Sequence, residues 1–517
     1  MATRVKVFAD TYLDSVLQLS GTRSMFDVDG VEWAAAAMAT PANLDILLGQ
    51  GFASADVGPA SANDLFVAAR AADEAVVEAA IGAAEQALFA ARSGGGADRA
   101  ERRARTVDEA VSLHPGTNVA IVSVPGDYAA IEAHKALSAG LHVLLFSDNV
   151  TVADEVELKD RAGQVGRLVM GPGAGTAMLG GIGLGFANVV RRGRVGVIAA
   201  AGTGAQEAMS LLDRWGAGVS HVVGLGGRDL SEAVDGRMAK LAIAAMREDP
   251  GTDAILFVSK PPSPRVAKAV VGLAGGTPLV AAMVGLEAPL DLPDGVEVVT
   301  TLEEGVIRAL AAVGIDAPDP SDGLTAQVED ACARLSSSAS GDRRLVRGLF
   351  SGGTLCYESL VILTRRLGPI YSNTPIDKRY GLPAPDGSHV CLDLGEEEYT
   401  KGRPHPMIDP QARVGLLRAE GRSPETAVVL LDVVLGHGSH PDPAGELAPV
   451  CAEVIDGGAG PQVVAYVLGT AGDPQGFEGQ RAKLRDAGCL VTETAARASL
   501  AAAALALRDP ALVTARP

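Results

Sequence analysis

Aromatic side chains, cysteines and basic residues are scarce in this chain of 517 residues, and each shortage excludes a class of protein. Phe, Trp and Tyr make up only 4% of the sequence, whereas hydrophobic residues together make up 47%. A core of small apolar residues with many glycine turns favours closely packed strand–helix units over an all-β sandwich. The 44 Lys and Arg against 63 Asp and Glu give a net charge of −19, which argues against a nucleic-acid-binding surface.

The cysteines are few and scattered, and no pair has the C-x-x-C spacing of a metal or redox site. An odd number in a long chain favours reduced thiols over a disulfide framework, so we expect a cytoplasmic protein. Charged residues stand near the N-terminus, where a secretion signal needs apolar ones, and every apolar run is broken short of a membrane span. The five cysteines are Cys332, Cys356, Cys391, Cys451 and Cys489.

The length predicts an α/β protein of several domains. Alternating short strands and helices at the start predict a small α+β domain of the ferredoxin-like or ACT-like kind. The next domain is Rossmann-like, but no G-x-G-x-x-G with a following acidic residue marks it for a dinucleotide. The predicted segments are the small domain 1–92, a linker 93–108, the Rossmann-like domain 109–187, a first lobe 188–316, a connector 317–344 and a second lobe 345–517.

A glycine turn in the first lobe is the strongest local signal in the sequence. Residues 195–201 form a continuous apolar run, typical of a buried parallel strand, and Gly202-Thr203-Gly204 leads from it into an amphipathic helix. The N–H groups and positive dipole end of a helix that begins this way attract an anion, most often a phosphate. A tight strand–helix turn without a ligand is the alternative.

The same order of parts recurs in the second lobe. Residues 345–360 combine an apolar strand, the turn Gly352-Gly353-Thr354 and a helix. Two lobes with corresponding turns predict a pseudo-twofold arrangement in which both helix starts face one phosphate. The alternatives are two unrelated turns, and ordinary helix capping by the hydroxyls of Thr203 and Thr354.

Five further side chains are candidates for substrate contact or catalysis. Lys260 follows a strand of the first lobe and is a candidate phosphate ligand, and Arg228 is a weaker one, with a loop ion pair as its alternative. His437 is a candidate general acid or base; it has no recognisable metal-ligand spacing. Arg403 and His405 flank Pro404 in a polar region and are predicted to contact substrate.

Several phrases carry a family resemblance. VGVIAAAGTGAQEA, GLGGRD and GLFSGGTLCYES resemble the ligase lobes of succinyl-CoA synthetase, and 122–149 with MGPGAG resembles the end of its CoA-binding domain. SGGTLCYE, KGRPHPMIDP and LLDVVLGHGSHPDPAGEL are similar to the FdrA family over nearly the whole chain. The resemblance implies a Rossmann-like domain followed by two flavodoxin-like ligase lobes.

The chain departs from succinyl-CoA synthetase where that family places its phosphohistidine. The corresponding residues 278–289 contain no histidine, and Lys260 stands where the family has a glutamate. The FdrA resemblance implies a carbamoyltransferase subunit that interconverts carbamoyl phosphate plus oxamate and oxalurate plus phosphate.

The same resemblance implies two partner subunits, with a homo-oligomer as the alternative. We expect no required cofactor. The alternatives are an acyl-CoA synthetase, for which CoA or a nucleotide would be needed, and a non-catalytic subunit that senses phosphate or CoA.

Overall fold

A computed structural model describes residues 2–13, 15–93, 104–286, 292, 294–337, 343–400, 404–455 and 460–517. They form two compact units, one from Met1–Arg103 with Glu397–Pro404 and the other from Ala104–Glu396 with His405–Pro517. No described helix is long and apolar enough to cross a membrane.

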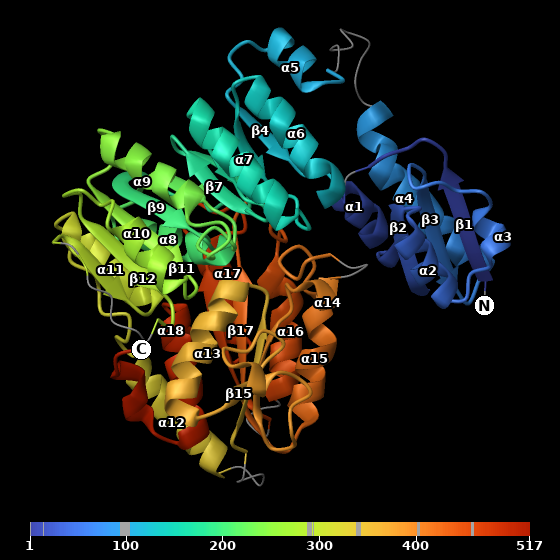
Figure 1. The fold of residues 1–517 in the computed structure, drawn as a ribbon. Coiled ribbons are helices and arrows are strands. Elements are labelled where there is room, and N and C mark those ends of the chain that lie inside the picture. The colour runs from blue at the N-terminus through green and yellow to red at the C-terminus, as the bar shows by residue number, and fades with distance from the viewer. Residues whose placement is uncertain are drawn as a thin grey trace. The chain divides into compact units, whose positions relative to one another are not determined.

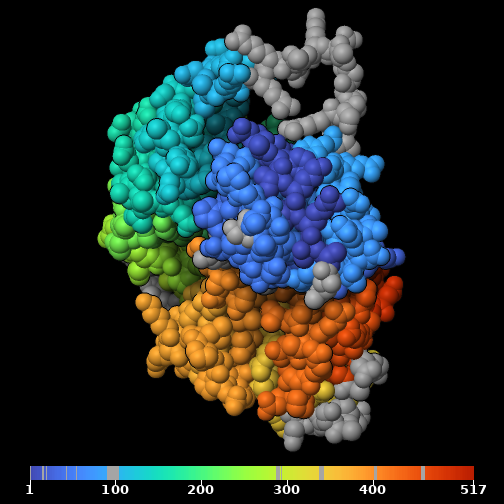
Figure 2. Space-filling model, turned by 90° about the vertical axis from the view of Figure 1, so that its right-hand side faces the viewer, coloured from blue at the N-terminus to red at the C-terminus, as the bar shows by residue number. Residues whose placement is uncertain are grey.

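The first unit is a three-stranded antiparallel sheet with helices packed on it. The middle strand pairs with both neighbours, in the order β1-β3-β2, and its residues Leu65–Ala71 are nearly all buried. This small α+β architecture is the kind predicted for 1–92, and its residues form one compact body in the space-filling view (Figure 2). Its elements are β1 (Ala2–Phe8), α1 (Ser15–Phe26), β2 (Val31–Met38), α2 (Pro41–Gly49), α3 (Ser54–Val57), β3 (Leu65–Ala71) and α4 (Glu74–Ser93).

The second unit starts with a three-stranded parallel sheet in the order β4-β5-β6. Thr151 starts α7 by accepting a hydrogen bond from the N–H of Asp154 at 3.1 Å, and Gly166 ends the helix in the left-handed conformation. This Rossmann-like domain consists of α5 (Val107–Leu113), β4 (Val119–Val122), α6 (Gly126–Ser138), β5 (His142–Leu145), α7 (Val152–Val165) and β6 (Val169–Met170).

The first lobe has a seven-stranded sheet in the order β13-β12-β11-β9-β10-β7-β8. The five strands from β9 onward are parallel and follow the flavodoxin-like order 2-1-3-4-5, with helices on the sheet (Figure 1). The hairpin β7–β8 adds antiparallel strands at the β10 edge, although the sequence assigned those residues to the Rossmann-like domain. The elements are β7 (Thr176–Leu179), β8 (Ile182–Gly185), β9 (Arg192–Ala199), α8 (Gly202–Arg214), β10 (Val219–Gly224), α9 (Arg237–Glu248), β11 (Ala254–Ser259), α10 (Pro264–Val271), β12 (Leu279–Met283), β13 (Val296–Val299) and α11 (Leu302–Ala312).

The second lobe repeats this plan with a six-stranded parallel sheet in the order β15-β16-β14-β17-β18-β19. Without the short edge strand β15, the order is again 2-1-3-4-5. Both lobes have the predicted flavodoxin-like fold. The elements, with the preceding connector helix, are α12 (Leu324–Ser337), β14 (Leu345–Phe350), α13 (Gly353–Leu367), β15 (Ile370–Tyr371), η1 (Lys378–Tyr380), β16 (His389–Asp393), α14 (Glu397–Thr400, in the first unit), α15 (Gln411–Arg422), β17 (Thr426–Val434), α16 (Pro443–Ile455), β18 (Gln462–Leu468), α17 (Phe477–Asp486), β19 (Leu490–Thr492), α18 (Ala495–Leu507) and η3 (Pro510–Thr514).

Two buried glutamates join the lobes reciprocally. Glu358 on α13 accepts a hydrogen bond at 2.6 Å from the N–H of Leu302, the first residue of α11 in the other lobe. Glu207 on α8 accepts one from the N–H of Ala495, the first residue of α18, and another from the hydroxyl of Tyr466. Each glycine-turn helix therefore caps the last helix of the opposite lobe, which fixes α8 and α13 relative to one another.

Candidate anion site at two glycine turns

The two glycine turns are in direct contact. The backbone N–H of Thr354 donates a hydrogen bond to Oγ1 of Thr203 at 3.3 Å. A Cβ at Gly204 would lie 2.9 Å from Cγ2 of Thr354, and one at Gly352 would lie 2.9 Å from Cγ2 of Thr203. Glycine at both positions permits this close approach, so the helix starts that the sequence placed 151 residues apart converge.

The first turn faces open space. No side chain caps α8 at Ala201, and Gly202 is exposed. A Cβ added at Gly202 meets no atom within 4 Å. The first N–H groups of α8 and the positive end of its dipole are therefore available to an anion.

The second turn is partly occupied by a side chain of its own lobe. Asp432, at the end of β17, accepts hydrogen bonds from the backbone N–H groups of Ser351 and Gly352, both at 2.7 Å. Its charge is balanced by the buried guanidinium of Arg413, whose Nη1 lies 3.0 Å from Oδ1. The carboxylate takes the place that an external anion would occupy at these two N–H groups.

A second buried carboxylate, Asp393, lies at the end of β16, which pairs with β14 on the side opposite β17. Its Oδ1 accepts a hydrogen bond from the N–H of Gly395 at 3.0 Å, and a Cβ at Gly353 would lie 2.5 Å from its Oδ2. Asn373 holds its backbone by accepting from the N–H at 2.9 Å and donating to the carbonyl at 2.8 Å. Burial raises the pKa of Asp393 to about 6, although the nearby charge of Lys260 acts to lower it.

Lys260 reaches from the first lobe toward the second. Its Nζ lies 5.4 Å from the centre of the Tyr357 ring on α13. Its charge also opposes the large rise that burial causes in the pKa of the Cys356 thiol. Cys356 is therefore a packed, protonated thiol and no nucleophile. The predicted cation is thus beside the start of α13 and beside Asp393.

His405 joins the same end of the second sheet. Its Nδ1 accepts a hydrogen bond from the N–H of Met407 at 3.2 Å, and its Nε2 lies against Gly395, where a Cβ would be 2.6 Å away. Burial lowers the pKa of His405 to about 4. The imidazole is neutral at pH 7, so it acts as a hydrogen-bonding group and contributes no positive charge.

Three other predicted residues are not gathered at the turns. Arg228 forms an ion pair with Glu155 at 2.9 Å and donates to the carbonyl of Val150 at 2.8 Å, so it joins the first lobe to the Rossmann-like domain. The side chain of His437 is exposed, and its backbone N–H donates a hydrogen bond to the carbonyl of Ala187 at 2.8 Å. Arg403 lies outside the described residues.

Sequence reasoning missed Asp393, Asp432 and the paired glutamates. Asp393 and Asp432 lie near the carboxyl ends of β16 and β17, the strands on either side of β14. Carboxyl ends of parallel strands meet at one edge of a sheet, so the sequence pattern could have indicated both aspartates. Both turns also continue as Gly-Thr-x-x-x-Glu, ending at Glu207 and Glu358. That match would have strengthened the repeat and identified the residues that join the lobes.

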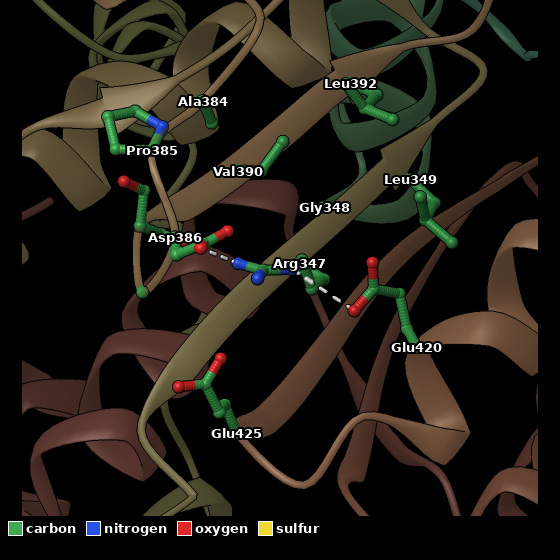
Figure 3. Close-up of a pocket in the computed structure, with 12 residues that line it drawn as sticks. Arg347, Gly348, Leu349, Ala384, Pro385, Asp386, Val390, Leu392, Glu420 and Glu425 are labelled. Carbon is green, nitrogen blue, oxygen red and sulfur yellow. Dashed lines mark hydrogen bonds and ion pairs between the residues drawn. The ribbon is translucent and has the colours of Figure 1, made fainter.

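Two cavities lie away from the turns. One of about 280 Å³ lies beside residues 347–349 of β14, where Arg347 is paired with Glu420 at 3.2 Å (Figure 3). Another of about 520 Å³ lies between the Rossmann-like domain and the first lobe, lined by His142 and His221 among apolar side chains. Neither is lined by a residue of the glycine turns.

Comparison with known proteins agrees with this architecture. Residues 349–505 match the CoA-ligase family, and residues 1–104 match the family described as AllF, heavy metal-associated domain. YahF, an uncharacterized protein of Escherichia coli (strain K12), is 37% identical over 513 residues, which cover 97% of this chain and 98% of YahF. The chain belongs to the family of YahF. This family is FdrA/AllF-like and related to succinyl-CoA synthetase.

More distant matches are to CoA ligases. The α-subunit of ADP-forming succinate–CoA ligase from Aquifex aeolicus is 30% identical over 161 residues, or 30% of this chain and 51% of that subunit. The chain thus spans about half the length of that subunit. The dinucleotide-forming acetyl-coenzyme A synthetase 1 of Ca. Korarchaeum cryptofilum, solved with phosphate and ADP, is 17% identical, with coverage of 77% of this chain and 84% of that one and a TM-score of 0.28.

The N-terminal domain of this FdrA/AllF-like chain does not fit the metal in its family's description. Residues 1–104 contain neither cysteine nor histidine, the ligands on which soft heavy-metal sites depend. Within the described ranges, no three His, Cys, Asp or Glu side chains are grouped so as to hold a metal ion. The domain's fold is present without the donor set.

Proposed function

We propose that this FdrA/AllF-like protein binds carbamoyl phosphate at the junction of α8 and α13, as a subunit of a carbamoyltransferase. The reaction interconverts carbamoyl phosphate plus oxamate and oxalurate plus phosphate. One observation carries the proposal: the uncapped start of α8 faces open space where Thr203 touches the second turn and Lys260 approaches from β11.

The site would promote the reaction mainly by electrostatic stabilisation of the transition state. The phosphate that leaves the carbamoyl group gains negative charge as its C–O bond breaks. The N–H groups of α8 and the ammonium of Lys260 stabilise that charge, and the fixed lobes position the donor for attack. Removal of one such donor in other enzymes costs about 10²–10³ in rate.

The proposal includes two partner subunits and no phosphohistidine. Residues 278–289 contain no histidine to accept a phosphoryl group. We expect the isolated chain to bind the phosphate donor but to transfer carbamoyl groups weakly or not at all. Full turnover of carbamoyl phosphate and oxamate by the isolated chain would show that the partners are not required.

Binding to the isolated chain is the first test. Calorimetry with carbamoyl phosphate, and with inorganic phosphate, should detect binding that Lys260→Met weakens and that the exposed, distant Asp386→Asn leaves unchanged. Equal affinity in wild type and Lys260→Met would show that Lys260 does not contribute to binding of the anion. No binding to the wild type would refute the proposal.

An acyl-CoA ligase is the second candidate, because the more distant relatives are named as such. It requires a phosphoryl acceptor and affinity for CoA. Incubation with labelled ATP or GTP should leave no acid-labile phosphate on the protein if the carbamoyltransferase proposal holds. Stoichiometric phosphohistidine would favour the ligase.

A further inference from the structure

Asp393 occupies an unusual place for a charged side chain. Only 2% of its surface is exposed, and its Oδ2 is turned toward the backbone of Gly353 in the first turn of α13. Asn373 holds its backbone from both sides, and Gly395 holds Oδ1. The carboxylate is therefore held by hydrogen bonds and points one oxygen at the start of α13, beside the junction where we propose that the anion binds.

Charged side chains from several surrounding elements act on the ionisation of Asp393. Lys260 from the end of β11 is the opposite charge that favours ionisation, whereas Glu396 in its own loop and Asp432 on β17 disfavour it. The remaining titratable neighbours, Cys356 on α13 and His405 beside Gly395, are uncharged at pH 7. The ammonium of Lys260 thus faces Glu396, any bound phosphate and Asp432, whose own charge is paired with the buried Arg413, so Asp393 is close to the balance between its charged and neutral forms.

We infer that Asp393 is a catalytic residue that carries a proton to and from the phosphate bound at the glycine turns. This inference rests on the proposed function. An ionised carboxylate beside a phosphate dianion would repel it, so binding of the anion requires Asp393 to take up a proton. The protonated acid then donates a hydrogen bond to the phosphate.

The transfer step balances with this single proton. The amide nitrogen of oxamate forms a bond to the carbamoyl carbon, and the bond from that carbon to the phosphate oxygen breaks. The electron pair of the broken bond stays on the phosphate oxygen, which receives the proton of Asp393. The proton lost by the amide nitrogen returns to the Asp393 carboxylate, so the products are oxalurate and hydrogen phosphate.

Sulfate separates the proton of Asp393 from that of the ligand, because sulfate does not itself titrate near neutral pH. Calorimetry at pH 7 in buffers of different ionisation enthalpy should show that the full chain takes up a fraction of a proton when sulfate binds. Its affinity for sulfate should fall as pH rises from 6 to 8. In Asp393→Asn, which keeps an oxygen for the N–H of Gly395, the uptake should vanish and sulfate should bind about tenfold more tightly at pH 8.

The variant should have the opposite effect on turnover. In the complex with its partner subunits, Asp393→Asn should lower carbamoyl transfer by about 10²–10⁴, the usual range for loss of an acid–base group. Asp386→Asn should leave binding, proton uptake and turnover unchanged. Tighter binding with slower transfer is a combination that a purely structural role would not give.

The possible failures are distinct. Unchanged proton uptake in Asp393→Asn, or a wild-type affinity for sulfate that does not vary with pH, would overturn the inference while leaving the anion site intact. Absence of both sulfate and phosphate binding at pH 6 would instead overturn the proposed function. The pH dependence of the wild type decides the matter even if Asp393→Asn does not fold.

Discussion

The two glycine turns have the same order of parts and different chemistry. Ala199 and Phe350 correspond, because each stands three residues before the first residue of its helix. Val258 pairs with Ala199, and Leu431 pairs with Leu349, the residue before Phe350. The next residue, Asp432, therefore corresponds to Val258. In the first lobe this position is a buried valine, and the start of α8 is uncapped. In the second lobe it is an aspartate that accepts from the turn's own N–H groups.

The residue at this strand position thus decides what the N–H groups just before the helix bind. Ser351 and Gly352 donate to the Asp432 carboxylate, whereas Ala200 in the first lobe donates to the backbone carbonyl of Val258. The second turn carries an internal anion and supports the first through the contact between Thr354 and Thr203. A shared cradle with equal contributions from both turns is the sequence-based prediction. Our proposal instead has the ligand held mainly by α8, because the start of α8 is uncapped and N–H groups of the second turn already donate to Asp432.

The largest effect is expected from removal of the internal anion. Asp432→Ala leaves the buried Arg413 without its partner, and breaking a buried ion pair typically costs about 3–5 kcal/mol. We expect a loss of that size in the free energy of unfolding measured with urea. The double change Asp432→Leu with Arg413→Met should cost less than Asp432→Ala alone. A loss below about 1 kcal/mol for the single change would mean that Asp432 does not hold the second turn.

The pH dependence of stability tests the paired glutamates on the two helices. Burial raises the pKa of Glu207 to about 7 and that of Glu358 to about 8. The folded state holds these protons more tightly than the unfolded state, so the stabilising contribution is complete below about pH 4.5 and is lost as pH rises through 7 and 8.

Urea unfolding between pH 5.5 and 8.5 should therefore show stability that declines with pH, by at most about 1.4 kcal/mol per pH unit for each group. Glu207→Gln and Glu358→Gln should each flatten the curve, and the double variant should flatten it most. Asp393, whose pKa is raised to about 6, adds to the decline at the acidic end of this range, whereas His405, whose pKa is lowered to about 4, opposes the decline there. The comparison with the two variants therefore carries the test, and a stability that rises between pH 7 and 8.5 would contradict the assignment.

Valine at the two turns should separate ligand binding from folding. Gly202→Val enters open space and should weaken sulfate binding about tenfold, because up to about 2 kcal/mol comes from a partly buried helix start. Gly353→Val meets Asp393 at 2.5 Å and should lower stability as well. Calorimetry with urea unfolding checks both variants. Equal loss of sulfate affinity with intact stability in both would restore the shared cradle.

The smallest effect is expected at the contact between the turns. Thr203→Val removes the oxygen that accepts from the N–H of Thr354, which should cost about 1 kcal/mol of stability. Thr203→Ser keeps that oxygen and serves as the matched control. If the two variants were equally stable, the hydrogen bond between the lobes would contribute nothing measurable.

The local parts of this fold were readable from the sequence because they depend on neighbours in the chain. Apolar runs of strand length followed by glycine predicted β9, β14 and the helices after them. The flavodoxin-like order of both lobes followed from the resemblance and agrees with the observed pairing. Residues 176–185 were predicted within the Rossmann-like domain, but they form the hairpin β7–β8 on the sheet of the first lobe, because strand partners far apart in sequence leave no local signal.

The amino-acid sequence alone predicted two helices that start at glycine turns, and a lysine at a neighbouring strand end. Which N–H groups at these turns are available depends on tertiary contacts, because Asp432 binds the N–H of Gly352 across 80 residues of chain. The tertiary structure also decided the protonation of Asp393 and the glutamates, since burial is a property of the packed molecule. The sequence fixes which charged side chains the protein carries, whereas packing decides which of these side chains a bound ligand can contact.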